Sequence, residues 1–181
     1  MRSLRVVVIL CAFVLCMAGF VAANSAVAAS AAEIDQKSQN ALQKLYAKSS
    51  KAKELSEKAV AILVFPDIVK AGFIVGGQYG EGELIRDGKV IGYYNTVSGS
   101  YGLQAGIQKY GYALFFMSES ALKWLDKSDG FELGTGPTIV VVDTGAAGSL
   151  TTTTAQSSIY AFFFNQKGLM GGLGLQGTKV T

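Results

Sequence analysis

Residues 79–94 read YGEGELIRDGKVIGYY and hold two β-prone runs joined by Asp87-Gly88. An Asp-Gly pair in this setting predicts a tight β-hairpin, because both residues tolerate the positive φ that a two-residue turn requires. Before the turn, Gly82 and Leu84 alternate with the two glutamates, so they lie on opposite faces of the expected strand. The chain is therefore built around an antiparallel hairpin.

Further β-prone runs flank this hairpin on both sides. Pro66-Asp67 is expected to end the first run, and residues 165–168 (NQKG) are expected to form a hairpin loop between the last two. Connections this short favour antiparallel pairing, and the many glycines favour bends and close backbone approach. The additional runs predicted to be strands are 61–65, 69–75, 101–108, 112–117, 138–143, 150–154, 159–164 and 169–175.

The N-terminal part of the chain has a helical pattern instead. Apolar residues recur at three- and four-residue steps over 32–60, and neither Gly nor Pro interrupts them. Ser118 is placed to cap a short helix over 119–127, closed by Gly130. The predicted fold class is α+β: a long N-terminal helix packed on a curved, mostly antiparallel, barrel-like β-sheet, with one short additional helix.

Residues 1–31 have the layout of a secretory signal peptide. Arg2 and Arg5 precede an apolar run at 6–18, which is shorter than the ~20 residues that a spanning helix needs. A signal anchor is the alternative reading. Small residues allow cleavage after Ala28 or after Ala31, and the sequence leaves that choice open. We expect an exported protein, periplasmic or outer-membrane-associated, with a single domain over 32–181.

Several chemistries are excluded or disfavoured. There are no histidines, which removes His-dependent nucleophilic catalysis and every zinc site that needs imidazole. GLGLQG at 172–177 has nucleotide-loop spacing, but no βαβ unit surrounds it. Glu81 and Glu83 could form a glycosidase pair, yet two acids on the wet face of a hairpin are the commoner case. Without Arg2 and Arg5 of the signal segment, fourteen basic and thirteen acidic residues remain, which is too balanced for a general nucleic-acid binder. We predict no enzyme, no cofactor and no metal.

The run IYAFFF at 159–164 must present aromatic rings on both faces of one strand. The first interpretation is a core strand lying under the long helix. The alternative is an apolar groove or a membrane-contact patch.

Two segments resemble the SYLF domain family. AILVF at 61–65 with VKAGFIVGG at 69–77 resembles the start of that domain, and GLMGGLGLQGTK at 168–179 resembles its end. Between them, LQAG at 103–106, LG at 133–134 and GAAG at 145–148 are similar to the secreted bacterial branch. The resemblance covers about residues 33–181.

The resemblance implies a lipid-binding module. Eukaryotic members bind phosphoinositides and, in some cases, actin filaments, through a basic N-terminal amphipathic helix and other positive residues. Lys70 matches the family's lysine in K-A-G-F. This chain departs from those members in carrying a signal sequence and in lacking an SH3 or FYVE domain, so actin-type binding is not expected here.

The predicted site consists of lysines that contact anionic lipid headgroups. Lys70 interrupts an apolar run, where a lysine is costly to bury, and is expected at the mouth of a headgroup site. Lys44, Lys48 and Lys51 are expected to share one face of the long helix. The predicted partner is a phospholipid or membrane surface. The alternative is a structural or interaction protein of the envelope that binds a polypeptide.

Overall fold

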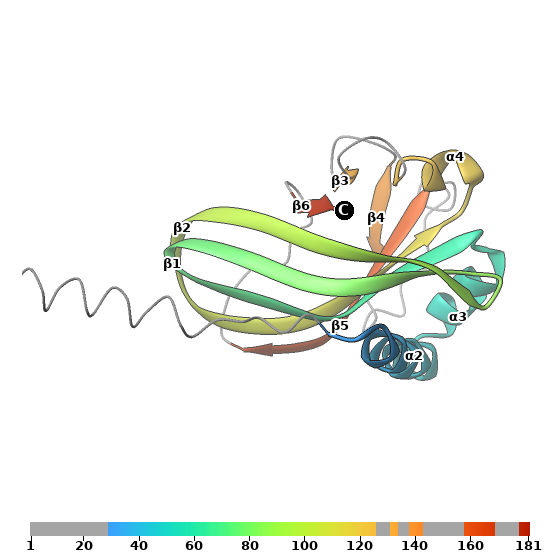
Figure 1. The fold of residues 1–181 in the computed structure, drawn as a ribbon, viewed down its shortest axis with the longest axis horizontal. Coiled ribbons are helices and arrows are strands. Elements are labelled where there is room, and N and C mark those ends of the chain that lie inside the picture. The colour runs from blue at the N-terminus through green and yellow to red at the C-terminus, as the bar shows by residue number, and fades with distance from the viewer. Residues whose placement is uncertain (1–28, 126–130, 134–137, 143–157, 169–177) are drawn as a thin grey trace, which may run out of the picture.

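The structure of the chain, a computed structural model, describes residues 29–125, 131–133, 138–142, 158–168 and 178–181. The architecture is α+β, with helices outside a curled, half-barrel mixed sheet (Figure 1). The predicted signal segment up to residue 28, the turn at 145–148, the strands at 150–154 and 169–175, the Gly130 cap and the 172–177 glycine motif lie outside the described residues. The predicted boundary between signal and domain stays a prediction.

A single long ribbon of two strands forms most of the sheet. β1 (Ala61–Arg86) and β2 (Lys89–Phe116) pair antiparallel from the turn to their far ends. Asp87 and Gly88 adopt φ of 51° and 73°, so the predicted hairpin turn is confirmed. Figure 1 shows the ribbon bending back on itself, so that each strand runs out and returns.

The prediction of several short strands in this region was wrong, because the chain bends without breaking its pairing. The expected runs 61–65, 69–75 and 79–86 are parts of β1, and 90–94, 101–108 and 112–117 are parts of β2. Pro66 and Asp67 do not end a strand. They form an irregularity in the register between Phe65 and Ile68, which is one of the few places in a strand that tolerates proline.

The other strands extend the sheet at its two edges. β5 (Ile159–Gly168) pairs antiparallel with β2, and β4 (Ile139–Val142) pairs parallel with β5. β6 (Thr178–Val180) joins the other part of β2, and β3 (Phe131–Leu133) pairs with β6. The sheet is therefore mostly antiparallel, as predicted, with one parallel pair.

The loop predicted at 165–168 is instead the end of β5. Asn165 has φ of 55° and lies at a register shift, beyond which Lys167 pairs with Lys109 of β2. Asparagine tolerates this left-handed conformation. A turn-like composition therefore produced a bulge within a strand.

Both faces of the central strands are buried, which confirms the core interpretation of 159–164. Ile159, Ala161 and Phe163 face the interior of the half-barrel, whereas Tyr160, Phe162 and Phe164 pack beneath the helices. The interior cluster also contains Leu63, Phe65, Tyr112, Leu114 and Phe116, and the helix-side cluster contains Leu42, Leu45, Leu55, Val64 and Phe115. The strands read as continuous apolar runs because each face has a partner.

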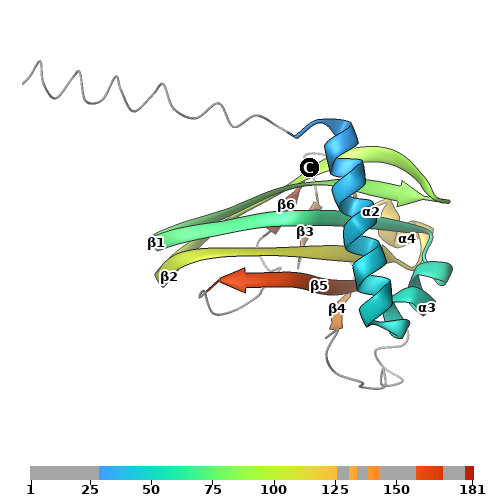
Figure 2. The ribbon, with the colours of Figure 1, turned by 90° about the horizontal axis from the view of Figure 1, so that it is seen from below.

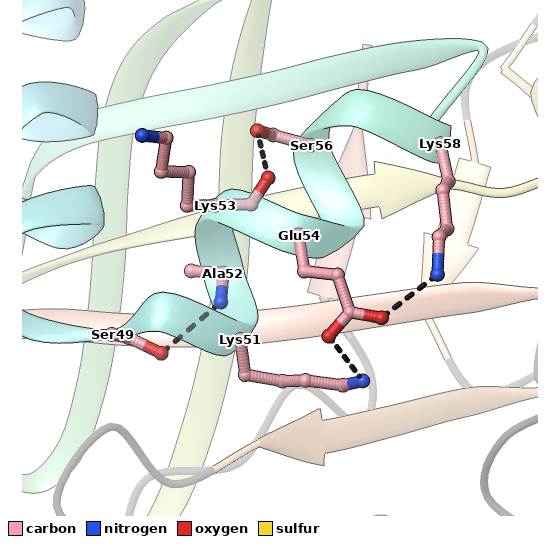
Figure 3. A network of polar contacts seen from close by, with 7 residues as sticks. All are labelled: Ser49, Lys51, Ala52, Lys53, Glu54, Ser56 and Lys58. Carbon is pink, nitrogen blue, oxygen red and sulfur yellow. Dashed lines mark hydrogen bonds and ion pairs between the residues drawn. The ribbon is translucent and has the colours of Figure 1, made fainter.

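The predicted single helix over 32–60 is two helices, α2 (Ala31–Lys48) and α3 (Ser50–Lys58). Ser49 lies between them in extended conformation, and its N–H donates to Leu45 O. Its Oγ accepts from the Ala52 N–H at 3.1 Å, which caps α3 (Figure 3). Serine can end one helix and start the next without Gly or Pro. α4 (Glu119–Leu122) is capped by Ser118, as predicted, but it is shorter than the helix expected over 119–127, because residues 123–125 form a turn.

Gly82 lies against the backbone of the other half of β1, and Gly111 lies opposite the irregularity at Pro66 in the β1–β2 pairing, and these close approaches yield a stability prediction. A Cβ at Gly82 would lie 2.1 Å from Val64 O, and one at Gly111 would lie 2.6 Å from Pro66 O. We expect Gly82→Ala and Gly111→Ala to lower the free energy of unfolding by about 1–3 kcal/mol, the usual cost of overpacking. Urea unfolding followed by circular dichroism measures it.

Gly99 is the matched control, because a Cβ there has no atom within 4 Å. Gly99→Ala should change stability by less than about 1 kcal/mol. Equal effects at the three positions would contradict the close approach.

Candidate functional site

The outer face of the sheet is only partly covered by helix. Figure 2 shows α2 crossing β1, β2 and β5, which extend well beyond it. On the extended part, Val69 and Ile107 are 42% and 62% exposed, although both are large apolar residues. They lie on the same face as the helix-covered residues Ala113 and Phe115 of β2, as strand alternation and register require. This part of the sheet therefore continues the apolar face on which α2 packs, but no described helix covers it.

Two lysines occupy the same uncovered face. Lys109 of β2 and Lys167 of β5 are directly opposite each other in the antiparallel register, and both are exposed. Directly opposed side chains of an antiparallel pair project to one side, where like charges are destabilising. Among the described residues neither lysine has an ion-pair partner. We call Val69, Ile107, Lys109 and Lys167 the basic sheet patch. It combines positive charge with exposed aliphatic surface.

The sequence interpretation missed this patch for two reasons. The predicted strand 101–108 stopped one residue before Lys109, and residues 165–168 were assigned to a loop. One signal was present: Ile107 and Lys109 are two residues apart, so any strand that includes both places them on one face. The opposing Lys167 could not be found without the register of β5.

Lys44 and Lys48 lie one turn apart on α2, both exposed, as predicted. Lys44 borders a hollow whose other lining residues include Lys37, Asp67 and Asn165. Asn165 is two residues from Lys167 on β5, so this flank of α2 adjoins the basic sheet patch. Lys37 is itself engaged, by Glu33 at 2.7 Å and Asp67 at 3.8 Å, and the bond with Glu33 raises the pKa of its ammonium.

Lys51 does not share that helix. It belongs to α3, where Glu54 accepts from both Lys51 at 2.9 Å and Lys58 at 2.8 Å (Figure 3). Hydrogen bonds, first from Lys58 and then from Lys51, lower the pKa of Glu54 to about 2. The expectation of one face for Lys44, Lys48 and Lys51 rested on an unbroken helix and was wrong for Lys51.

Lys70 lies on the opposite side of the sheet from the basic sheet patch. It pairs with Gln108, and both face the interior of the half-barrel, where Lys70 is half-buried. Gln108 is buried, and its Oε1 has no hydrogen-bond partner among the described residues. Nearby on this face, the Tyr110 hydroxyl donates to Gln78 Oε1 at 2.6 Å. The interior surface around Lys70 is therefore polar, and its predicted headgroup role stays a prediction.

A buried carboxyl lies beneath α2. Glu83 of β1 is fully buried, and neither carboxyl oxygen has a hydrogen-bond partner among the described residues. Asp35 of α2 lies beside it and accepts from the Tyr93 hydroxyl at 2.9 Å. Burial, and then the adjacent Asp35 carboxylate, raise the pKa of Glu83 to about 8. At neutral pH Glu83 is therefore mostly protonated, and α2 packs over a neutral group.

Within the described ranges, no three Cys, Asp or Glu side chains are grouped so that they could hold a metal ion. Of the helices that the structure describes, none is long and apolar enough to cross a bilayer.

The described residues form a small α+β domain whose sheet has an uncovered face that carries the basic sheet patch. Residues 97–181 match the family model described as Ysc84, Las17-binding protein actin regulator. This match agrees with the resemblance to the SYLF family that the closing motif at 168–179 indicated, whereas the opening motif at 61–77 lies outside the matched residues. The family is generally a non-catalytic binding domain associated with lipid and actin-regulator binding. No curated protein matches the chain. The matched segment includes Lys109 and Lys167 but none of the four lysines singled out from the sequence.

The raised pKa of Glu83 predicts an unusual pH dependence of stability. The folded chain holds a proton on Glu83 up to about pH 8, whereas an unfolded glutamate releases it near pH 4.3. The folded state therefore binds more protons in this window, and stability falls as pH rises from about 4.5 to 8. Glu83→Gln should remove this loss and raise Tm at pH 8 by roughly 2–4 °C for each kcal/mol regained, with little change at pH 4.5.

Calorimetry of both proteins across that pH window checks this. Glu57→Gln, at an exposed position on α3, is the control and should leave the slope unaltered. Parallel wild-type and Glu83→Gln profiles would contradict the burial of a proton at this site.

Proposed function

We propose that the chain is a non-catalytic module of the cell envelope that binds anionic membrane surfaces through the basic sheet patch. The observation that carries the proposal is the direct pairing of Lys109 with Lys167 beside exposed Val69 and Ile107. Folding brings two like charges together without an acidic partner among the described residues, and this costs stability. Negative lipid headgroups beside Lys109 and Lys167 would offset the repulsion between the two ammonium groups and attract both of them to the membrane.

The lysines of this patch can contact anionic headgroups, and its aliphatic side chains can enter the boundary between headgroups and acyl chains. Each basic residue near an anionic bilayer contributes roughly 1 kcal/mol. Exposed aliphatic side chains between the lysines can enter the headgroup region, where their burial contributes about 25 cal/mol per Å². Lys44 and Lys48 on the adjoining flank of α2 would add long-range attraction.

Lys51 is shared with Glu54 and would contribute less. Lys70, on the interior face, would be a separate contact for a single anionic headgroup rather than part of the membrane surface. Export to the periplasm or the outer membrane follows from the N-terminal signal pattern and is part of the proposal.

A second surface favours the alternative, a polypeptide partner. Tyr79, Ile91, Tyr93 and Val97 are all about half exposed and project from the outer face of the other half of the ribbon. Exposed aromatic surface without a cationic pair is typical of protein contact. The matched family description names a Las17-binding actin regulator. An exported chain would not meet actin inside its own cell, so the partner in this alternative is an envelope protein.

Vesicle sedimentation of lysine variants measures how much each pair of lysines contributes to membrane binding. With chain from Ala29 onward and vesicles of mixed anionic and neutral phospholipid, Lys109→Gln/Lys167→Gln should weaken partitioning about 10–30-fold, the equivalent of about 1.4–2 kcal/mol. Salt should weaken the wild-type protein more than the variant, since exposed charges are screened. Neutral vesicles should bind neither protein strongly.

Lys89→Gln/Lys123→Gln removes the same charge from exposed positions at the hairpin turn and beside α4, and should leave binding within about twofold of wild type. Lys44→Gln/Lys48→Gln should have an intermediate effect. If the control variant loses as much affinity as the patch variant, attraction depends on net charge and the patch is not the contact. Wild-type protein that ignores anionic vesicles would favour the polypeptide partner.

Val69→Ser/Ile107→Ser tests the apolar part of the same patch. These side chains are exposed, so the fold should be retained, as circular dichroism would verify. Affinity for anionic vesicles should fall several-fold, and the loss should persist at high salt because burial of apolar surface is not screened. An unchanged affinity would mean that the lysines act from outside the headgroup layer.

A further inference from the structure

The backbone N–H of Ala29 lies against the carboxylate of Glu81, whose negative charge also acts on the more distant Lys37. It donates to Glu81 Oε2 at 2.9 Å, across a separation of 52 residues. The other oxygen, Oε1, accepts from the Tyr79 hydroxyl at 2.9 Å. Glu81 has no ion-pair partner in the part of the chain that the structure describes. The Glu81 carboxylate thus holds Ala29 in place, but the neutral amide of Ala29 does not neutralise the negative charge of Glu81.

The surroundings of Ala29 are acidic. A hollow beside it is lined by Glu81, Asp67 and a single cation, Lys37. Lys37 is already held by Glu33 and Asp67. A second hollow, which Ala29 also lines, includes Glu81, Tyr93 and Asn95 and no cation. The site therefore has one negative charge in excess, next to a backbone nitrogen.

We propose that the exported chain is cut between Ala28 and Ala29, and that Glu81 and Tyr79 form a binding site for the α-ammonium group of Ala29. Hydrolysis adds water across the peptide bond, leaving a carboxylate on Ala28 and an amine on Ala29, which takes up a proton. The new charge lies where Glu81 lacks a partner. The amide already donates to an ionised acceptor, and the ammonium adds its own positive charge, so Coulomb attraction strengthens the contact further.

The helix start distinguishes this bond from the other one that the signal pattern allows. Ser30 caps α2: its Oγ accepts from Glu33 N–H at 3.3 Å, and its carbonyl accepts from Ile34 N–H at 3.0 Å. Cleavage after Ala31 would remove Ala29 and Ser30 together, so both the cap and the Glu81 contact would be lost. Cleavage after Ala28 keeps both and places Ala26 and Ala28 at the small-residue positions before the cut.

The first test is N-terminal sequencing and intact mass of the full chain after expression and export. The expected first residue is Ala29. A chain that begins at Ala32, or one that keeps residues 1–28, would overturn the proposal. This proposal shares export with the proposed function but needs no lipid binding, so vesicle results bear on that function alone.

The second test isolates the ammonium. Both core clusters lie between Ala41 and Val180, so a chain that starts at Ala29 retains the entire core. Nα-acetylation of this chain should lower Tm by about 2–4 °C. In Glu81→Gln the same acetylation should have no effect, whereas in the control Glu57→Gln it should have the full effect. Equal acetylation effects in wild type and Glu81→Gln would refute the pairing.

Discussion

The contact between the two halves of β1 governs the rest of the structure. A Cβ on Gly82 would lie 2.1 Å from the carbonyl oxygen of Val64, a separation that no side chain permits. This approach closes the ribbon into a half-barrel whose interior is filled by Leu63, Tyr112 and Phe163. The outside of the same strands then needs its own cover, which α2 and α3 supply. The close approach of the two halves of β1 therefore accompanies two apolar layers, one inside the half-barrel and one beneath α2 and α3.

The cover is shorter than the sheet. α2 spans 18 residues and crosses the strands rather than following them (Figure 2), so it shields Ala113 and Phe115 but leaves Ile107 and Lys109 in solvent. The same alternation that buries one part of a strand exposes the next part. An exposed surface with apolar and basic side chains thus arises because the helix layer is shorter than the sheet.

Local chemistry in the sequence predicted the local structure well. Asp87-Gly88 predicted the turn, Ser118 the cap of α4, and IYAFFF a strand buried on both faces. Errors arose where tertiary contacts overrode local signals: Pro66 and Asn165 became irregularities inside strands, because pairing with β2 continued on either side. Ser49 divided a helix that only Gly or Pro was expected to interrupt. The sequence did not predict that the β1–β2 ribbon bends back on itself. The glycine that permits the close approach can be identified only from its tertiary contacts.

The candidate site shows the same division. The sequence predicted lipid contact through Lys44, Lys48 and Lys51 on one helix and through Lys70, but the partners of a charge depend on the fold. Lys37, Lys51 and Lys58 are each held by a carboxylate close in sequence, so part of the helix's positive charge is already compensated. Lys109 and Lys167 come from strands more than fifty residues apart and meet only through register. Their charges are adjacent and uncompensated among the described residues, and for this reason the proposed anionic contact is placed on the sheet rather than on α2 and α3.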